Sequence, residues 1–164
     1  MKHFQARIFL LVISVIAIGS IASAKDLTHR LGVGFKNNTS VSIPSLAGVY
    51  FYSKDLAFTA SVGLDTQKNA STFQASGGAR YIMFFENNMN AYVSGQFGVI
   101  NSEDATGKAS GVEILGTGGV EFFFTGLENL GFTIEAGLGL STLRNTRMRT
   151  VADDPLRAGF TFYF

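Results

Sequence analysis

The residues of this chain with the clearest chemical potential are charges set within segments where apolar and small polar residues alternate. Successive side chains of such a segment point to opposite faces. The charges fall on the polar faces, at Arg30, Asp65, Arg80, Glu113, Glu121, Glu135 and Arg157. If the fold encloses these polar faces, each charge on them needs an opposite charge or water. The pattern then predicts ion pairs inside the protein, with separate hydration of each charge as the alternative. We expect two layers, composed of Arg30, Arg80, Glu121 and Glu135 in the first and of Asp65, Glu113 and Arg157 in the second.

Patterns for catalysis, metal binding and phosphate binding find little support. His29 is the only histidine after residue 24, no cysteine occurs, and we see no serine placed beside His29 as a partner. A metal site would need a cluster of histidines and carboxylates. The glycine-rich run 116–119 would need a following helix to hold a phosphate. We therefore expect no enzymatic activity, no cofactor and no metal.

The elements that must position the charges are eight segments with a period of two, which is typical of β-strands. They cover residues 27–35, 45–53, 56–65, 72–83, 91–99, 112–122, 132–141 and 156–164. The third is the cleanest, whereas the second has apolar residues on both faces, so its orientation stays open. In the first segment, Leu27 is expected on the same face as Leu31, Val33 and Phe35. The last segment ends on Phe164, and a soluble edge strand so rich in aromatic residues would invite aggregation.

The connections between the segments indicate a closed barrel. Each segment is about as long as a tilted membrane strand, which needs roughly 9–11 residues. An even number of strands puts both chain ends on the same side. The connections near 53–55, 86–89 and 125–129 are short, whereas those near 36–44, 66–71, 101–110 and 144–155 are mostly longer. Short turns on the side of the termini and longer loops opposite are typical of outer-membrane barrels.

The N-terminus has the order of a cleavable signal peptide: Lys2 and Arg7, an apolar run over 8–22, and small residues at 22–24. An uncleaved anchor is the alternative, but the run is short for a membrane helix. We expect residues 1–24 to be removed and residues 25–164 to form one barrel domain. Eleven lysines and arginines then oppose twelve acidic residues, since Lys2 and Arg7 are lost. This balance excludes the basic face of a nucleic-acid-binding protein.

Three features predict that the apolar face points outward. The opposite face carries mostly glycine, serine and threonine, which suit a cramped barrel interior, and its few charges nearly balance. Aromatic residues also gather toward the short-turn side, where a girdle at the membrane interface is expected. The members of this expected girdle are Tyr50, Phe51, Tyr52, Phe58, Tyr81, Phe84, Phe85, Tyr92, Phe122, Phe123, Phe124, Phe132, Phe160, Phe162, Tyr163 and Phe164. The alternative is a soluble lipocalin-like barrel with its apolar face inside.

The strand count, the loop asymmetry and the ending 158–164 (AGFTFYF) resemble the small eight-stranded outer-membrane barrels. This group holds the OmpA transmembrane domain, OmpX and the opacity-type surface proteins. The resemblance covers residues 25–164 and implies an all-β, antiparallel, up-and-down transmembrane barrel in the cell outer membrane. The ending looks like the C-terminal signal by which the barrel assembly machinery recognises its substrates. Function within the group must be argued from sites, because architecture is what its members share.

Two functions remain open at this stage. A structural or surface-interaction barrel is the first, and a narrow channel for small or apolar solutes is the alternative, because the expected interior is rich in glycine. The last loop contains Arg144, Arg147 and Arg149, and arginines just outside a bilayer can bind lipopolysaccharide phosphates. A solvated loop whose charge is offset by Asp153 and Asp154 is the other interpretation. We expect a monomer with membrane lipid and lipopolysaccharide as partners, and no nucleic acid.

Overall fold

The computed structural model describes residues 26–37, 43–67, 70–105, 107–150 and 157–164. The predicted signal peptide, residues 1–24, lies outside these residues and stays a prediction. Across the described ranges, no helix has both the length and the apolar character to cross a membrane.

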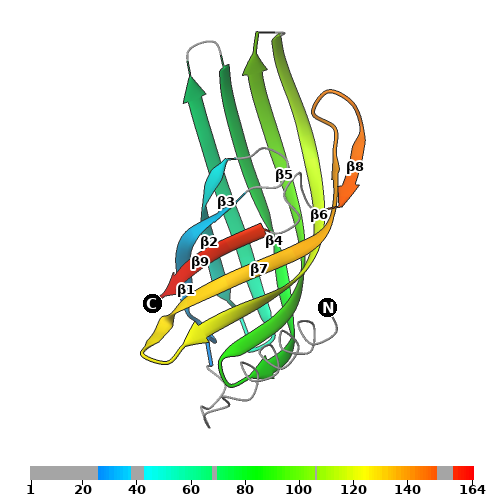
Figure 1. The fold of residues 1–164 in the computed structure, drawn as a ribbon. Helices are drawn as coiled ribbons and strands as arrows, with labels where there is room; N and C mark the ends of the chain where they lie inside the picture. Colours follow the sequence, from blue (N-terminus) through cyan, green and yellow to red (C-terminus); the bar gives the residue numbers. More distant parts are fainter. Residues whose placement is uncertain (1–25, 38–42, 68–69, 106, 151–156) are drawn as a thin grey trace, which may run out of the picture.

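Nine β-strands make up the described structure (Figure 1). Their bounds are β1 Leu31–Asn37, β2 Pro44–Phe51, β3 Leu56–Gln67, β4 Ala70–Glu86, β5 Met89–Asp104, β6 Gly107–Phe124, β7 Leu127–Ser141, β8 Arg147–Thr150 and β9 Arg157–Tyr163. All pairings between them are antiparallel.

Eight of these strands form a closed barrel. β1 to β7 pair in sequence, and β9 lies between β1 and β7, so that no edge is left between the first and last strands. In the closing pair, Gly32 lies opposite Tyr163 and Phe35 lies opposite Phe160. Closure of this kind removes the exposed edge that makes an aromatic-rich terminal strand hazardous. The predicted all-β, eight-stranded antiparallel barrel is confirmed.

The ninth strand, β8, lies within the segment that the sequence predicted as a loop at 144–155. β9 pairs with β7 only as far as Glu135, which is opposite Arg157. The remaining upper part of β7 pairs with β8, where Leu140 lies opposite Met148. The loop prediction was therefore wrong at 147–150, because β7 is longer than β9 and its free hydrogen-bonding edge takes up a second partner. Residues 151–156 lie outside the described structure.

The connections expected at 66–71 and 101–110 are also largely strand. β3 continues to Gln67, and the β5–β6 pairing extends to Asp104 opposite Gly107. These extensions carry polar residues on both faces, so the sequence shows no apolar alternation there. The backbone pairing nevertheless continues, which is why the strand ends were predicted too early. As a result, β3 to β6 rise well beyond β1, β2 and β9 at the loop end (Figure 1). The short turns after β2, β4 and β6 lie at the opposite end, as predicted.

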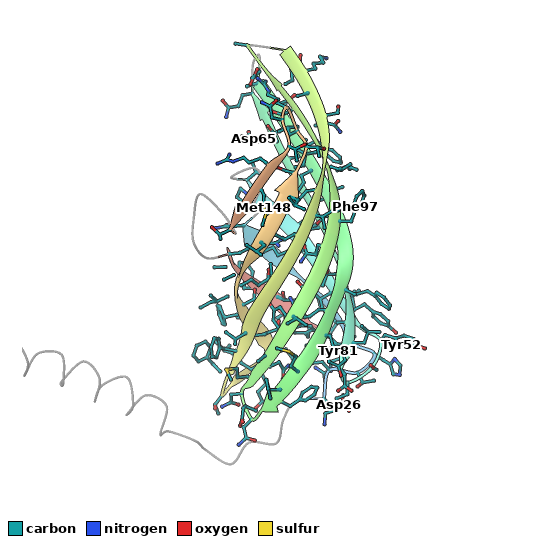
Figure 2. All side chains as sticks on the ribbon, turned by 90° about the vertical axis from the view of Figure 1, so that its right-hand side faces the viewer. Asp26, Tyr52, Asp65, Tyr81, Phe97 and Met148 are labelled. Atoms are coloured by element: carbon teal, nitrogen blue, oxygen red, sulfur yellow. The ribbon has the colours of Figure 1, made fainter. Side chains whose placement is uncertain are left out.

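The outward face of the barrel is an apolar belt. On β7, Phe132, Ile134, Ala136, Leu138 and Leu140 are all exposed, while Thr133 and Glu135 between them are buried. The belt on this strand spans 132–140, which matches the roughly 9–11 residues of a tilted membrane strand. In Figure 2, Tyr52 and Tyr81 lie near the short-turn end, Asp65 lies toward the other end, and Phe97 lies between these levels. An exterior of this kind suits lipid and not water.

Two orientations could be assigned only from the structure. In β2, Ala47, Val49 and Phe51 are buried, whereas Leu46 and Tyr50 are exposed, because β1 fixes the register with Leu31 opposite Tyr50. Leu27 was predicted on the outer face with Leu31, but it is only 2% exposed. A turn with a bond from Arg30 N–H to the Leu27 carbonyl, and His29 at φ 62°, interrupts the alternation and folds Leu27 into the barrel.

The belt gives a first prediction about stability in lipid. Ala136→Arg places a charge at the middle of the belt and should lower the free energy of unfolding by about 2–4 kcal/mol. Asn101→Arg is the matched control beyond the apolar rows of β5, where the cost should be at most about 1 kcal/mol. Denaturant titration of both variants in lipid vesicles measures the difference. Equal losses in the two variants would contradict the assignment of the belt.

Candidate functional site

Arg80 is the centre of a charged network inside the barrel. Its Nη1 lies 3.3 Å from Glu121 Oε2, and its Nη2 lies 3.6 Å from Glu135 Oε1. β4, β6 and β7 supply these three residues from inward-facing positions, and each is at most 2% exposed. The two carboxylates share one guanidinium, which satisfies charges that would be very costly to bury alone.

Two tyrosines complete the environment of Arg80. The Tyr92 hydroxyl donates a hydrogen bond of 2.7 Å to Glu135, and the Tyr163 hydroxyl donates one of 2.7 Å to Glu121. The Arg80 guanidinium carbon also lies 3.9 Å from the centre of the Tyr92 ring, which is a cation–π contact. β5 and β9 therefore join the network, which fixes the inward face of five strands at one level.

Arg157 extends the network toward the loop end. Its Nη1 lies 3.4 Å from Glu135 Oε2, both its terminal nitrogens reach Gln96 Oε1 at 3.4 Å, and its Nε donates to the Asn37 carbonyl at 2.9 Å. Lys36 is also buried, at 8% exposure. Among the described residues the buried charges are therefore balanced, with three cations and three carboxylates: Lys36, Arg80 and Arg157 against Glu113, Glu121 and Glu135.

The two predicted layers are not what the structure contains. Arg157 was expected in the layer near the loops, but it contacts Glu135 and so belongs to the same network as Arg80. Glu113 accepts a hydrogen bond of 3.0 Å from Gln74. Asp65 is exposed, because β3 extends past the rim of the barrel at this height. The sequence could not give these heights, since they depend on the stagger between strands.

Arg30 also differs from its prediction. Its Nη1 donates to Asn129 Oδ1 at 3.0 Å near the short turn between β6 and β7, and no contact between Arg30 and Glu121 or Glu135 is found. The turn at Leu27–Arg30 moves Arg30 out of the alternation of β1. Of the two arginines predicted in the first layer, only Arg80 lies between Glu121 and Glu135.

An apolar cluster seals the barrel below the charged network. Its buried members are Leu27, Val49, Phe51, Ala57, Ile82, Tyr92, Phe123 and Tyr163. Four of the aromatic residues assigned to the outer girdle, Phe51, Tyr92, Phe123 and Tyr163, are thus inside. Residue type suggested an interface position, but strand parity already placed Tyr92 and Tyr163 on inward faces. That parity was the signal that could have found them.

Glycines opposite the rings make this packing possible. A β-carbon at Gly119 would lie 2.9 Å from Tyr92 Cζ and 2.9 Å from Glu135 Cγ, and one at Gly32 would lie 2.6 Å from the Tyr163 ring. Real β-carbons do not approach other atoms so closely. At Gly32 and Gly119, the space that the sequence offered as possibly empty is filled by tyrosine rings from neighbouring strands.

The space above the network is also closed. The void between Gln74, Gln96, Glu113, Leu115 and Arg157 has no room for a water molecule. Hydroxyl pairs tighten the surrounding wall, with Ser94 and Thr117 at 2.6 Å and Ser61 and Ser76 at 2.7 Å. At this level the described interior is therefore filled by its own side chains, as expected for eight strands.

The three arginines expected to contact lipopolysaccharide do not share one environment. Arg144 Nη2 lies 2.6 Å from Asp104 Oδ2 across the loop end. Arg147 is exposed and lies opposite the buried Ser141, on the inner face of β8. The outer face of β8 carries Met148, which is 67% exposed, and Thr150, which lies opposite Leu138. Arg149 lies in β8 opposite Gly139, and its side chain is outside the described structure. Within the described residues, no group of three or more His, Cys, Asp or Glu side chains could hold a metal ion.

Comparison with solved structures identifies the architecture. The N-terminal β-barrel domain of Pseudomonas aeruginosa OprF is similar, with a TM-score of 0.60, 15% identity, and a match that covers 84% of this chain and 98% of that domain. The chain has the fold of a small outer-membrane β-barrel. Neisserial surface protein A (NspA) matches over 82% of this chain and 95% of that one, with 13% identity and a TM-score of 0.48. No family model matches the sequence of this small barrel, and no curated protein matches it.

The charged network gives a second prediction. Arg80→Ala leaves Glu121 and Glu135 together without their shared cation, so the barrel should lose about 3–5 kcal/mol of its free energy of unfolding. Arg144→Ala is the matched control, because its pair with Asp104 is about half exposed and should contribute at most about 1 kcal/mol. Denaturant titration in vesicles compares the two variants. A small effect at Arg80 would show that Glu121 and Glu135 do not depend on it.

Proposed function

We propose that this chain is an integral outer-membrane barrel with a sealed interior and a structural or surface-interaction role. The filled interior is the observation that carries the proposal. Three filled regions follow one another from the short-turn end upward. They are the apolar cluster, the network around Arg80 and the closed space beside Gln96. Since side chains fill the described interior at these levels, the interactions of the barrel are expected at its outer face and its loop end.

Placement in the outer membrane is supported by the exposed apolar belt, by the fold and by the predicted signal peptide. Membrane lipid and lipopolysaccharide are then the surrounding partners, and the barrel assembly machinery inserts the chain. The barrel acts as a monomer, because closure satisfies the hydrogen bonds of the first and last strands within one chain. The charges around Arg80 serve packing and not catalysis, since Glu121, Glu135 and Arg157 are paired within one network.

The long hairpins support the surface-interaction role. β5 and β6 have 16 and 18 residues, well beyond the roughly 9–11 that a membrane strand requires. The excess projects from the loop end as part of a sheet built from β3 to β6 (Figure 1). A purely structural barrel would not need this extension.

Conductance distinguishes this proposal from the narrow channel. The wild-type barrel in planar bilayers should show no conductance above background, because the space between Gln74, Gln96 and Arg157 has no room for a water molecule. Tyr92→Ala/Tyr163→Ala is the comparison, since it removes the two rings beside Arg80 and should produce measurable current in barrels that still insert. Discrete conductance steps in the wild type would favour the channel and overturn the sealed-barrel proposal.

A further inference from the structure

A groove with a volume of about 340 Å³ lies on the projecting part of β3 to β6. Eight of its lining residues form two rows across the four strands, because residues directly opposite in antiparallel pairs share a face. The lower row is Leu64, Phe73, Asn101 and Ser110, and the upper row is Thr66, Ser71, Glu103 and Lys108. We call these eight residues the rim groove. Leu64 and Phe73 are exposed at 68% and 37%, which places both rows on the outer face.

The rim groove lies where the apolar belt ends. The row directly below it is Val62, Ala75, Val99 and Val112, which is apolar throughout. The lower row of the groove is apolar on β3 and β4 and polar on β5 and β6, and the upper row is wholly polar. Because barrel strands are tilted, a membrane surface crosses such rows obliquely. The boundary between hydrocarbon and headgroups therefore runs through the groove.

The chemistry of the groove is that of an amphiphile site. Leu64 and Phe73 offer apolar surface at one side, whereas hydroxyl and amide groups of Thr66, Asn101 and Ser110 can both donate and accept hydrogen bonds. Glu103 and Lys108 form an ion pair of 3.2 Å, so the groove carries no net charge. The phosphates of an acylated saccharide would find no excess of cations here and would lie outside the groove, whereas its many sugar hydroxyls would find matching partners within it.

We propose that the rim groove binds an acylated saccharide of the outer leaflet, with sugar hydroxyls over Asn101 and Ser110 and an acyl chain against Leu64 and Phe73. This inference rests on the proposed outer-membrane placement and adds the partner and its site. Continuity with the belt argues for a lipid, since a molecule in the groove would have its lower part within the bilayer. The site lies on β3 to β6 and not on the arginines near β8.

The test uses the mature barrel, residues 25–164, in detergent micelles with two probes, purified lipopolysaccharide and phosphatidylethanolamine. Native mass spectrometry measures how much of each lipid remains bound. Asn101→Ala/Ser110→Ala should weaken lipopolysaccharide binding about tenfold through lost hydrogen bonds and leave phosphatidylethanolamine binding unchanged. Asn37→Ala is the matched control, because Asn37 is an exposed asparagine at the end of β1 on the opposite, lower wall; it should bind both lipids like the wild type.

Several outcomes would overturn the inference. They are equal lipopolysaccharide binding by the wild type and the double variant, equal affinity of the wild type for both lipids, and dimerisation that the double variant abolishes, which would assign the groove to a second copy. Insertion of each protein into vesicles is measured in parallel. A barrel that inserts but does not prefer lipopolysaccharide contradicts only this inference, whereas failure to insert contradicts the proposed function itself.

Discussion

The structure depends on the pairing that closes β1 against β9. With Gly32 opposite Tyr163, β9 keeps Phe160 and Phe162 outside and Arg157 inside. A shift of one residue would reverse the two faces of β9, moving Arg157 and Tyr163 outward and Phe160 and Phe162 inward. Closure also removes the edges of the first and last strands, so that the aromatic ending becomes part of a continuous lipid-facing surface. Register at this one seam thus decides what the interior contains.

A few side chains stabilise the interior through matching charges and hydrogen bonds. Arg80 pairs with two carboxylates, of which Glu135 also pairs with Arg157, and each carboxylate accepts a hydrogen bond from a tyrosine hydroxyl. Such a network contributes little net stability compared with apolar packing, but it is costly to break at a single member. It therefore favours one arrangement of the strands over others. The glycines beside the tyrosine rings serve the same end, because they accept a ring from the next strand where any larger residue would collide.

The proposed sealed interior moves the question of function to the surface. The wall of the barrel is uneven, since β1 and β9 have seven residues each while β6 has eighteen. The tall side carries outward-facing polar rows above the apolar belt, which is where the rim groove forms. The short side carries the seam and the network partner Arg157. The two sides are therefore suited to different tasks, contact with the surroundings on one and closure on the other.

The sequence by itself determined the strand alternation, the short turns, the count of barrel strands and the outward stripe such as Phe160 and Phe162, because all of these follow from a period of two within single segments. It also placed Arg80, Glu121 and Glu135 on inward faces. Only the tertiary structure decided which charges meet, since Arg157 reaches Glu135 through the stagger of β7 and β9. It likewise decided the burial of Leu27 through a turn, the orientation of β2 through its neighbour, and the strand character of β8. Local pattern fixes the face of a residue, whereas its height and its neighbours depend on the register between strands, which no single segment encodes.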